Sequence, residues 1–106
     1  MQQVIFKVKW TNPARNDVRE IKKFIAIDSP WYAQSVTSDI VRLARDIGRH
    51  PNVFTICPEW KSEKTRHRVV HGYRIIYDIR VRLVIILGVV HESRLVTNVK
   101  GHGFRS

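Results

Sequence analysis

The sequence contains a single cysteine, Cys57, so neither an intrachain disulfide nor a cysteine-based zinc site is possible. Its longest apolar run, Leu83–Val90, is far shorter than the roughly 20 residues that span a bilayer. The first ten residues alternate between apolar and polar types and lack the apolar core of a signal peptide. We therefore expect a soluble, cytoplasmic protein.

Acidic residues are also scarce. The chain has 19 lysines and arginines against 9 aspartates and glutamates, a formal net charge of +10, and a sequence pI of about 10.5. Such an excess costs stability through self-repulsion, so it indicates an anionic partner such as nucleic acid, a ribosome, a membrane surface or an acidic protein. Twelve of the cations are arginines, whose planar guanidinium suits bidentate contacts with phosphate or carboxylate.

The sequence lacks the motifs that are typical of several enzyme classes. The 5 glycines fall at expected caps, turns and the C-terminal region, and none forms a glycine-rich phosphate loop. The 5 histidines include no helical i,i+4 ligand pair, so we expect no metal site and no cofactor. A nucleophilic pair between Cys57 and a histidine stays open.

The first half of the chain predicts a strand followed by a helical hairpin. Apolar and polar residues alternate over 4–10, as in a strand with one apolar face. Thr11-Asn12-Pro13 supplies a capping side chain and then a proline, a typical helix start. Asp28-Ser29-Pro30 repeats this signal, and Gly48 is a C-cap for the second helix.

The second half predicts a sheet. Residues 49–64 are rich in Pro, Asn, Ser and charge and indicate a long loop. Strands are then expected over 66–70, Tyr73–Ile79 and Leu83–Val90, with His71-Gly72 as the first turn. Because Leu83–Val90 is apolar on both faces, we expect it to be central and covered on each side.

The fold class that follows is α+β, a single domain of β-α-α-β-β-β order with the helical hairpin packed on a small, mostly antiparallel sheet. Residues 1–96 are predicted to form this domain, and residues 97–106 a basic C-terminal tail.

Basic side chains gather in the strand-rich half. Residues two apart in a strand share a face, so two of them, Arg66 and Arg68, should point the same way. Two interpretations stay open: solvated charges on an open face, or a concave face that binds phosphate or an acidic partner. The set consists of Arg66, Arg68, Arg74, Arg80, Arg82 and Arg94.

Glu59 and His91 are candidates for a general acid/base pair, because proton transfer near neutral pH needs such groups beside a phosphate clamp. The alternatives are an ordinary loop carboxylate and a strand-end histidine with a structural hydrogen bond. Tyr73 and Tyr77 share a strand face, where packing is favoured over base stacking.

Three further aromatic residues lie near predicted helix or loop starts. They indicate either a protein-binding surface or simple packing. They are Trp31, Tyr32 and Trp60.

The order of motifs resembles that of RelE/ParE-family toxins over roughly residues 4–95. In the N-terminal half the similar pattern is Ala14-x-x-Asp17-Val18-x-x-Ile21, then Phe24-Ile25 and Ser29-Pro30-x-x-Ala33. In the C-terminal half it is Pro58-Glu59, Arg66-x-Arg68, Gly72-Tyr73-Arg74-Ile75-Ile76-Tyr77 and Val89-Val90-His91-x-x-Arg94. The resemblance implies the same β-α-α-β-β-β fold. It also implies a cognate antitoxin, commonly acidic, that wraps the toxin in a hetero-oligomer.

The family implies two targets. One branch cleaves mRNA in the ribosomal A site, and its catalytic set would here be Glu59, Arg66, Arg68, His91 and Arg94. The other branch poisons DNA gyrase. Residues 92–96 lack the aromatic side chain that the ribonuclease branch often carries after its last strand. Gyrase poisoning is therefore favoured, with ribosome-dependent mRNA cleavage as the alternative and a non-toxic, basic nucleic-acid-binding module as a third hypothesis.

Overall fold

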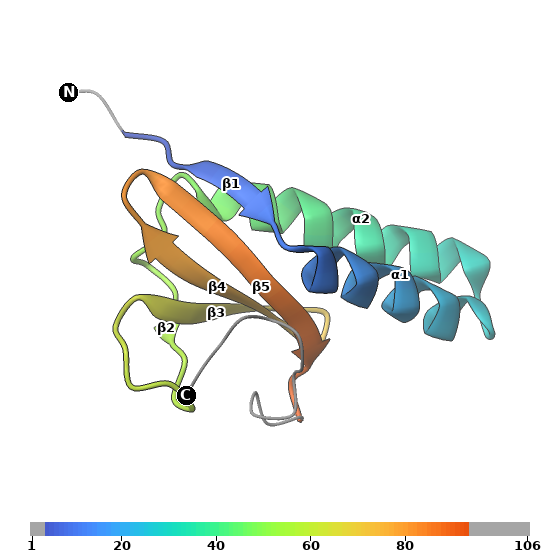
Figure 1. Ribbon diagram of the computed structural model, residues 1–106. Coiled ribbons are helices and arrows are strands. Elements are labelled where there is room, and N and C mark those ends of the chain that lie inside the picture. The colour runs from blue at the N-terminus through green and yellow to red at the C-terminus, as the bar shows by residue number, and fades with distance from the viewer. Residues whose placement is uncertain (1–3, 94–106) are drawn as a thin grey trace.

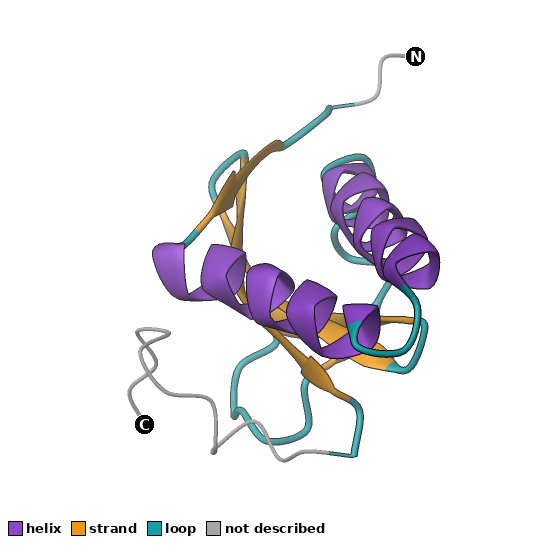
Figure 2. Ribbon diagram, turned by 90° about the vertical axis from the view of Figure 1, so that its right-hand side faces the viewer, coloured by secondary structure: helices purple, strands orange, loops and turns teal. Residues whose placement is uncertain are grey.

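The computed structural model describes residues 4–93, in which two helices cover one face of a five-stranded sheet (Figures 1 and 2). Among these residues, no helix combines the length and the apolar character needed to cross a membrane. The elements, in chain order, are β1 (Lys7–Trp10), α1 (Asn12–Ala26), α2 (Pro30–Ile47), β2 (Thr55–Ile56), β3 (Thr65–Val70), β4 (Tyr73–Arg80) and β5 (Leu83–His91).

Both helices begin where the sequence predicts. The Thr11 side chain accepts a hydrogen bond from the Ala14 amide at 3.2 Å, and proline stands in the first turn of α1. Ser29 caps α2 in the same way, accepting from the amide of Tyr32 at 3.0 Å. Each cap satisfies an amide that would otherwise have no partner at the helix start, which fixes the two boundaries.

Gly48 ends α2, as predicted, but for a different reason from the usual left-handed cap. Its φ of −61° is right-handed, so no positive φ is required there. The requirement is space: a Cβ on Gly48 would lie 2.5 Å from the carbonyl oxygen of Phe6 and 2.9 Å from Val8. The Phe6 amide also donates to the Gly48 carbonyl at 2.8 Å, so glycine lets the chain before β1 approach the end of α2.

The sheet has the strand order β1-β5-β4-β3-β2, in which β1 pairs parallel with β5 and every other pairing is antiparallel. This confirms the predicted mostly antiparallel sheet, with one addition. The expected loop over 49–64 contains the short edge strand β2, whose two residues pair with Arg66 and His67. Two residues are too few to show an alternating pattern, so β2 could not be predicted from the sequence.

The two hairpin turns differ in how well their sequences suit them. His71 and Gly72 both have positive φ, 51° and 80°, as two-residue hairpins favour, and glycine suits this geometry. The turn between β4 and β5 consists of Val81 and Arg82, and Arg82 adopts a φ of 54° without being glycine. Here the pairing of the two long strands fixes a turn that its composition does not favour.

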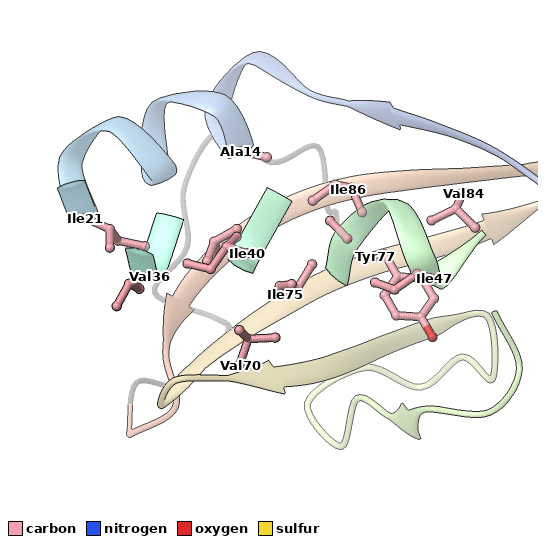
Figure 3. Close-up of a cluster of buried hydrophobic side chains, with 12 residues drawn as sticks. Ala14, Ile21, Val36, Ile40, Ile47, Val70, Ile75, Tyr77, Val84 and Ile86 are labelled. Atoms are coloured by element: carbon pink, nitrogen blue, oxygen red, sulfur yellow. The ribbon is translucent and has the colours of Figure 1, made fainter. Parts of the chain in front are cut away.

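Both faces of β5 are covered, as its apolar sequence predicts. On one face the helices and the sheet enclose the main core, which includes Ile40, Ile75, Tyr77 and Ile86 (Figure 3). On the opposite face a smaller cluster contains Cys57, Ile76, Leu87 and Val90, with Trp60 packed against it.

The two strand tyrosines are packing residues, as expected. Tyr77 is fully buried, and Tyr73 packs against the same core. The Tyr77 hydroxyl donates to the carbonyl of Pro51 at 2.6 Å, which satisfies its one polar group. Trp31 differs from them, since 78 % of it is exposed.

Candidate functional site

The arginines flagged in the sequence divide between the two faces of the sheet. Arg66 and Arg68 of β3 point to the helix side, where their register partners Tyr77 and Ile75 lie in the main core. The prediction that these two side chains share a face is therefore confirmed. Arg74 of β4 points to the opposite face, where the smaller apolar cluster lies.

Arg68 joins the sheet to the last turns of α2. Its Nη1 donates to the Leu43 carbonyl at 3.0 Å and to Asp46 Oδ2 at 3.0 Å. The guanidinium also lies 4.5 Å from the centre of the Phe54 ring, within range of a cation–π contact. Although burial acts to raise the pKa of Asp46, hydrogen bonds from Arg68 and His50 lower it below its usual range.

Arg66 holds the loop that precedes β2. Its Nη1 donates to the carbonyls of Asn52 and Phe54 at 3.1 and 2.9 Å, and its Nε donates to the carbonyl of Glu63 at 3.0 Å. Three backbone carbonyls thus receive hydrogen bonds from one side chain. To bind a phosphate with the same donors, Arg66 would have to release this loop.

On the opposite face, Arg74 is the centre of a second cluster. It is only 5 % exposed, and its Nη1 and Nη2 donate to the two Glu59 carboxylate oxygens at 2.9 and 2.8 Å. Its Nη2 also lies 3.3 Å from Cys57 Sγ and 3.0 Å from His67 Nδ1. Because a guanidinium only donates, His67 Nδ1 accepts here, which places the proton of the neutral imidazole on Nε2.

The acid–base properties of this cluster follow from its geometry. The hydrogen bonds from Arg74 hold the pKa of Glu59 at about 2. Burial, followed by the hydrogen bond to Glu59, raises the pKa of Cys57 to about 11. Burial and then the charge of Arg74 lower the pKa of His67. Near neutral pH the cluster is thus a fixed arrangement of carboxylate, thiol, neutral imidazole and guanidinium, which resembles a structural clamp more than a proton-transfer site.

The other predicted residues lie apart from these clusters. His91 ends β5, is exposed, and has its ring 5.6 Å from that of Tyr73 in an edge-on arrangement. Arg80 is exposed and pairs with Asp78 at 3.1 Å, and Arg82 lies exposed in the following turn. Arg94 and the predicted tail 97–106 lie outside the described residues. The structure thus brings Glu59 to Arg74, and Arg66 and Arg68 to one loop, without joining the two groups.

Asp46, Cys57 and His67 belong to these clusters but were not grouped with the arginines from the sequence. Strand alternation offered a signal for His67, because the β3–β4 turn makes Val69 the partner of Arg74 and leaves His67 two residues away on the same face. Asp46 gave no comparable signal, since it meets Arg68 only through the packing of α2 on the sheet. Among residues 4–93, no group of histidine, cysteine and carboxylate side chains could hold a metal ion.

The helical hairpin itself offers two surfaces. Its turn exposes large apolar side chains, with Phe24, Ile27 and Trp31 exposed by 70, 79 and 78 %. Beside the turn, a groove of about 460 Å³ runs between α1 and α2 over Val18, Thr37 and Val41. The groove is edged by four basic side chains: Arg19, Lys22, Arg42 and Arg45.

A helical hairpin packed on a mixed five-stranded sheet matches the fold of ParE and RelE toxins. The chain belongs to the ParE toxin family of type II toxin–antitoxin systems, whose family model matches residues 8–96.

Two solved structures of similar fold are toxin–antitoxin systems. The chromosomal ParDE system from P. aeruginosa contains a chain with a TM-score of 0.69 and 18 % identity, covering 82 % of this chain and 96 % of that one. The RelBE2 toxin–antitoxin complex from Mycobacterium tuberculosis contains one with a TM-score of 0.63 and 23 % identity, covering 88 % of this chain and 98 % of that one. A comparison with curated proteins finds no significant match.

Proposed function

We propose that this toxin arrests growth by poisoning DNA gyrase in the cytoplasm and is neutralised by a cognate antitoxin in a hetero-oligomer. It then acts as a binding protein and catalyses no reaction itself. Membership of the ParE family supports this proposal, and so does the similarity to two toxin–antitoxin systems.

The observation that carries the proposal is the separation of the candidate ribonuclease residues. An RNA-cleaving site needs a proton acceptor and cationic groups that converge on one phosphate. Here Glu59 lies on one face of the sheet in a bidentate ion pair with Arg74, while Arg66 and Arg68 point to the other face. A binding function does not require these residues to meet.

The exposed apolar turn of the helical hairpin suits a toxin that acts by binding. Phe24, Ile27 and Trp31 together present a large apolar area, and aromatic side chains are enriched at the centres of protein interfaces. The basic groove between α1 and α2 suits the antitoxin, because an acidic amphipathic segment could place apolar residues on its floor and carboxylates at its edges. The two surfaces would therefore serve two different protein partners.

A supercoiling assay with purified gyrase tests the proposal. Micromolar toxin should block supercoiling and leave trapped, cleaved DNA, and Trp31→Ser should weaken both effects because it removes exposed apolar area. Val53→Ser is the matched control, since Val53 is 71 % exposed but lies in the loop after α2, at the opposite end of that helix from the turn. Normal supercoiling without trapped cleavage complex at micromolar toxin would contradict the proposal.

Ribosome-dependent mRNA cleavage is the second candidate, favoured by one observation. His91 is exposed beside Tyr73, and both residues line a pocket of about 360 Å³ between α1 and the strand ends, where an imidazole could act on an RNA substrate. Primer extension on translated mRNA would then show cuts at A-site codons, and these would vanish in a variant with His91→Ala and Arg68→Ala. Unchanged toxicity in this variant would exclude the ribonuclease alternative.

Normal growth after induction of the wild-type chain would instead favour a non-toxic nucleic-acid-binding module.

A further inference from the structure

Four cationic side chains lie at one corner of the sheet, which we call the basic corner. Lys7 and Lys9 belong to the edge strand β1, Arg80 ends β4, and Arg82 stands in the turn before β5. All four are exposed.

The strand register places three of these residues on one face. Lys7 pairs with Leu83, which in turn pairs with Arg80, so Lys7 and Arg80 flank Leu83 in one row across three strands. Lys9 lies in the next row beside Ile85, which packs against the apolar cluster opposite the helices. Neighbours in such rows are about 5 Å apart, and Lys7 and Lys9 about 7 Å. The corner thus faces away from the helical hairpin.

Arg82 is held beside this face by the backbone. The Lys7 amide donates to the Arg82 carbonyl at 3.2 Å, which fastens the turn to β1. The left-handed φ of Arg82, 54°, is maintained by the strands on either side of the turn. The position of the fourth cation is therefore fixed by the fold.

The charge at the corner is largely uncompensated. Asp78 accepts from Arg80 at 3.1 Å, but it also accepts from the hydroxyl of Thr65 at 2.7 Å. Lys7, Lys9 and Arg82 form no ion pair with any residue of the described range 4–93. Cations this close repel one another, because they lie within roughly the 10 Å over which salt screens charge. An anionic polymer placed over them would relieve that repulsion.

The basic corner is also remote from the exposed apolar turn of the hairpin. In Figure 1 the β4–β5 turn lies at the left end of the molecule and the turn between α1 and α2 at the right end. One molecule can therefore bind a protein through Phe24, Ile27 and Trp31 at one end and a second, anionic surface at the other.

We propose that the basic corner binds the phosphate backbone of duplex DNA, so that the toxin contacts the DNA strand held by gyrase as well as the enzyme. The assignment of that DNA to gyrase rests on the proposed function, whereas duplex binding itself does not. An acidic peptide fits the groove between α1 and α2 better, because Val18 and Val41 give that groove an apolar floor. The corner is defined by its four exposed cations, and phosphates need cations without an apolar floor.

The test compares two triple variants that lose the same charge. One carries Lys7→Gln, Lys9→Gln and Arg82→Gln at the basic corner. The control carries Arg15→Gln, Arg19→Gln and Lys22→Gln, three exposed positions of α1 on the other side of the sheet. Thermal unfolding checks that both variants fold like the wild type.

Binding to a short DNA duplex is measured by fluorescence anisotropy at increasing salt. Each lost phosphate contact should reduce the slope of log K against log salt by about 0.9, so three contacts reduce it by about 2.7. Between about 50 and 200 mM salt, the affinity of the wild type should therefore fall about 40-fold more than that of the corner variant. The control variant should keep the wild-type slope.

The gyrase assay separates the two proposals. If the wild type inhibits gyrase, the corner variant should need at least tenfold more protein, and the control should not. If the corner variant inhibits gyrase as fully as the wild type and its salt slope is unchanged, the proposal that the basic corner binds DNA is wrong. The proposed function is then unaffected. A wild type without effect on gyrase defeats the proposed function, while the duplex titration still decides whether the corner binds DNA. The proposal is also wrong if the corner variant has a smaller salt slope than the wild type for single-stranded RNA but the same slope for duplex DNA.

Discussion

Replacing Glu59 with glutamine tests whether the Glu59–Arg74 ion pair stabilises the fold. The two side chains are 15 and 7 % exposed, so solvent screens their interaction weakly. Arg74 holds the pKa of Glu59 at about 2, against an ordinary value of 4.5. Because one pKa unit corresponds to about 1.4 kcal/mol, the pair contributes about 3 kcal/mol to the free energy of unfolding at neutral pH. Glutamine keeps the shape and part of the hydrogen bonding, so we expect a loss of about 2–3 kcal/mol.

The pKa of Glu59 also predicts how the stability difference between wild type and variant changes with pH. The carboxyl pKa is depressed in the folded state, so its stabilisation is complete well above 4.5 and declines as the pH falls toward 2. At pH 3.5 the wild type should retain about 2 kcal/mol of the contribution, so its advantage over the variant narrows by about 1 kcal/mol. Urea unfolding followed by circular dichroism at pH 7 and pH 3.5 measures both values.

Glu63→Gln is the matched control, because Glu63 is an exposed carboxylate in the same loop. It should change the free energy of unfolding by less than about 0.5 kcal/mol at either pH. A Glu59→Gln variant as stable as the wild type at pH 7, or a difference that does not vary with pH, would refute the argument from the ion pair. Below its unfolding temperature the same variant should still inhibit gyrase fully, since a structural clamp takes no part in binding that enzyme.

Two further predictions concern how α2 is attached. Gly48→Ala should lower the free energy of unfolding by about 1–3 kcal/mol, measured by urea unfolding, because the new Cβ would approach the Phe6 carbonyl oxygen to 2.5 Å. Gly72→Ala, where a Cβ would make only an ordinary contact with Glu92 at 3.9 Å but φ is 80°, separates the cost of backbone conformation from that of crowding. Arg68→Met should cost about 1.5–3 kcal/mol and speed proteolysis within residues 49–54, because Asp46 and Phe54 lose their common partner. Proteolysis at the wild-type rate would show that the loop is held without Arg68.

The predictions from sequence that were confirmed depend on short-range chemistry. Capping by Thr11 and Ser29 involves residues three apart, and alternation along β3 suffices to put Arg66 and Arg68 on one face. The apolar content of β5 alone indicates that both of its faces are covered. These features are encoded locally, so they can be predicted without knowing which elements meet.

The partners of the arginines could not be predicted in this way. Arg68 bonds to Leu43 and Asp46, which are 25 and 22 residues away in the chain. Arg74 is buried only because the loop that carries Glu59, 15 residues before it, folds over the open side of the sheet. Long-range packing of this kind decides whether an arginine in a strand is solvated, buried or available to a ligand. Neither the amino-acid composition nor the hydrophobic periodicity of the sequence contains this information.

This distinction changes the meaning of the +10 charge. Arg66, Arg68 and Arg74 belong to the family motifs, yet their donors face carbonyls and carboxylates of the same chain. They contribute to the net charge while their geometry serves the fold. Among residues 4–93, the attraction for an anionic partner must then come mainly from exposed bases that form no ion pair within this range. Examples are Lys7, Lys9 and Arg82 on the sheet and Arg19, Lys22 and Arg45 beside the helical groove. Substitutions at the basic corner should change how binding to duplex DNA depends on salt, and substitutions beside the helical groove should do the same for binding to the antitoxin. Substitutions at the motif arginines should act through stability.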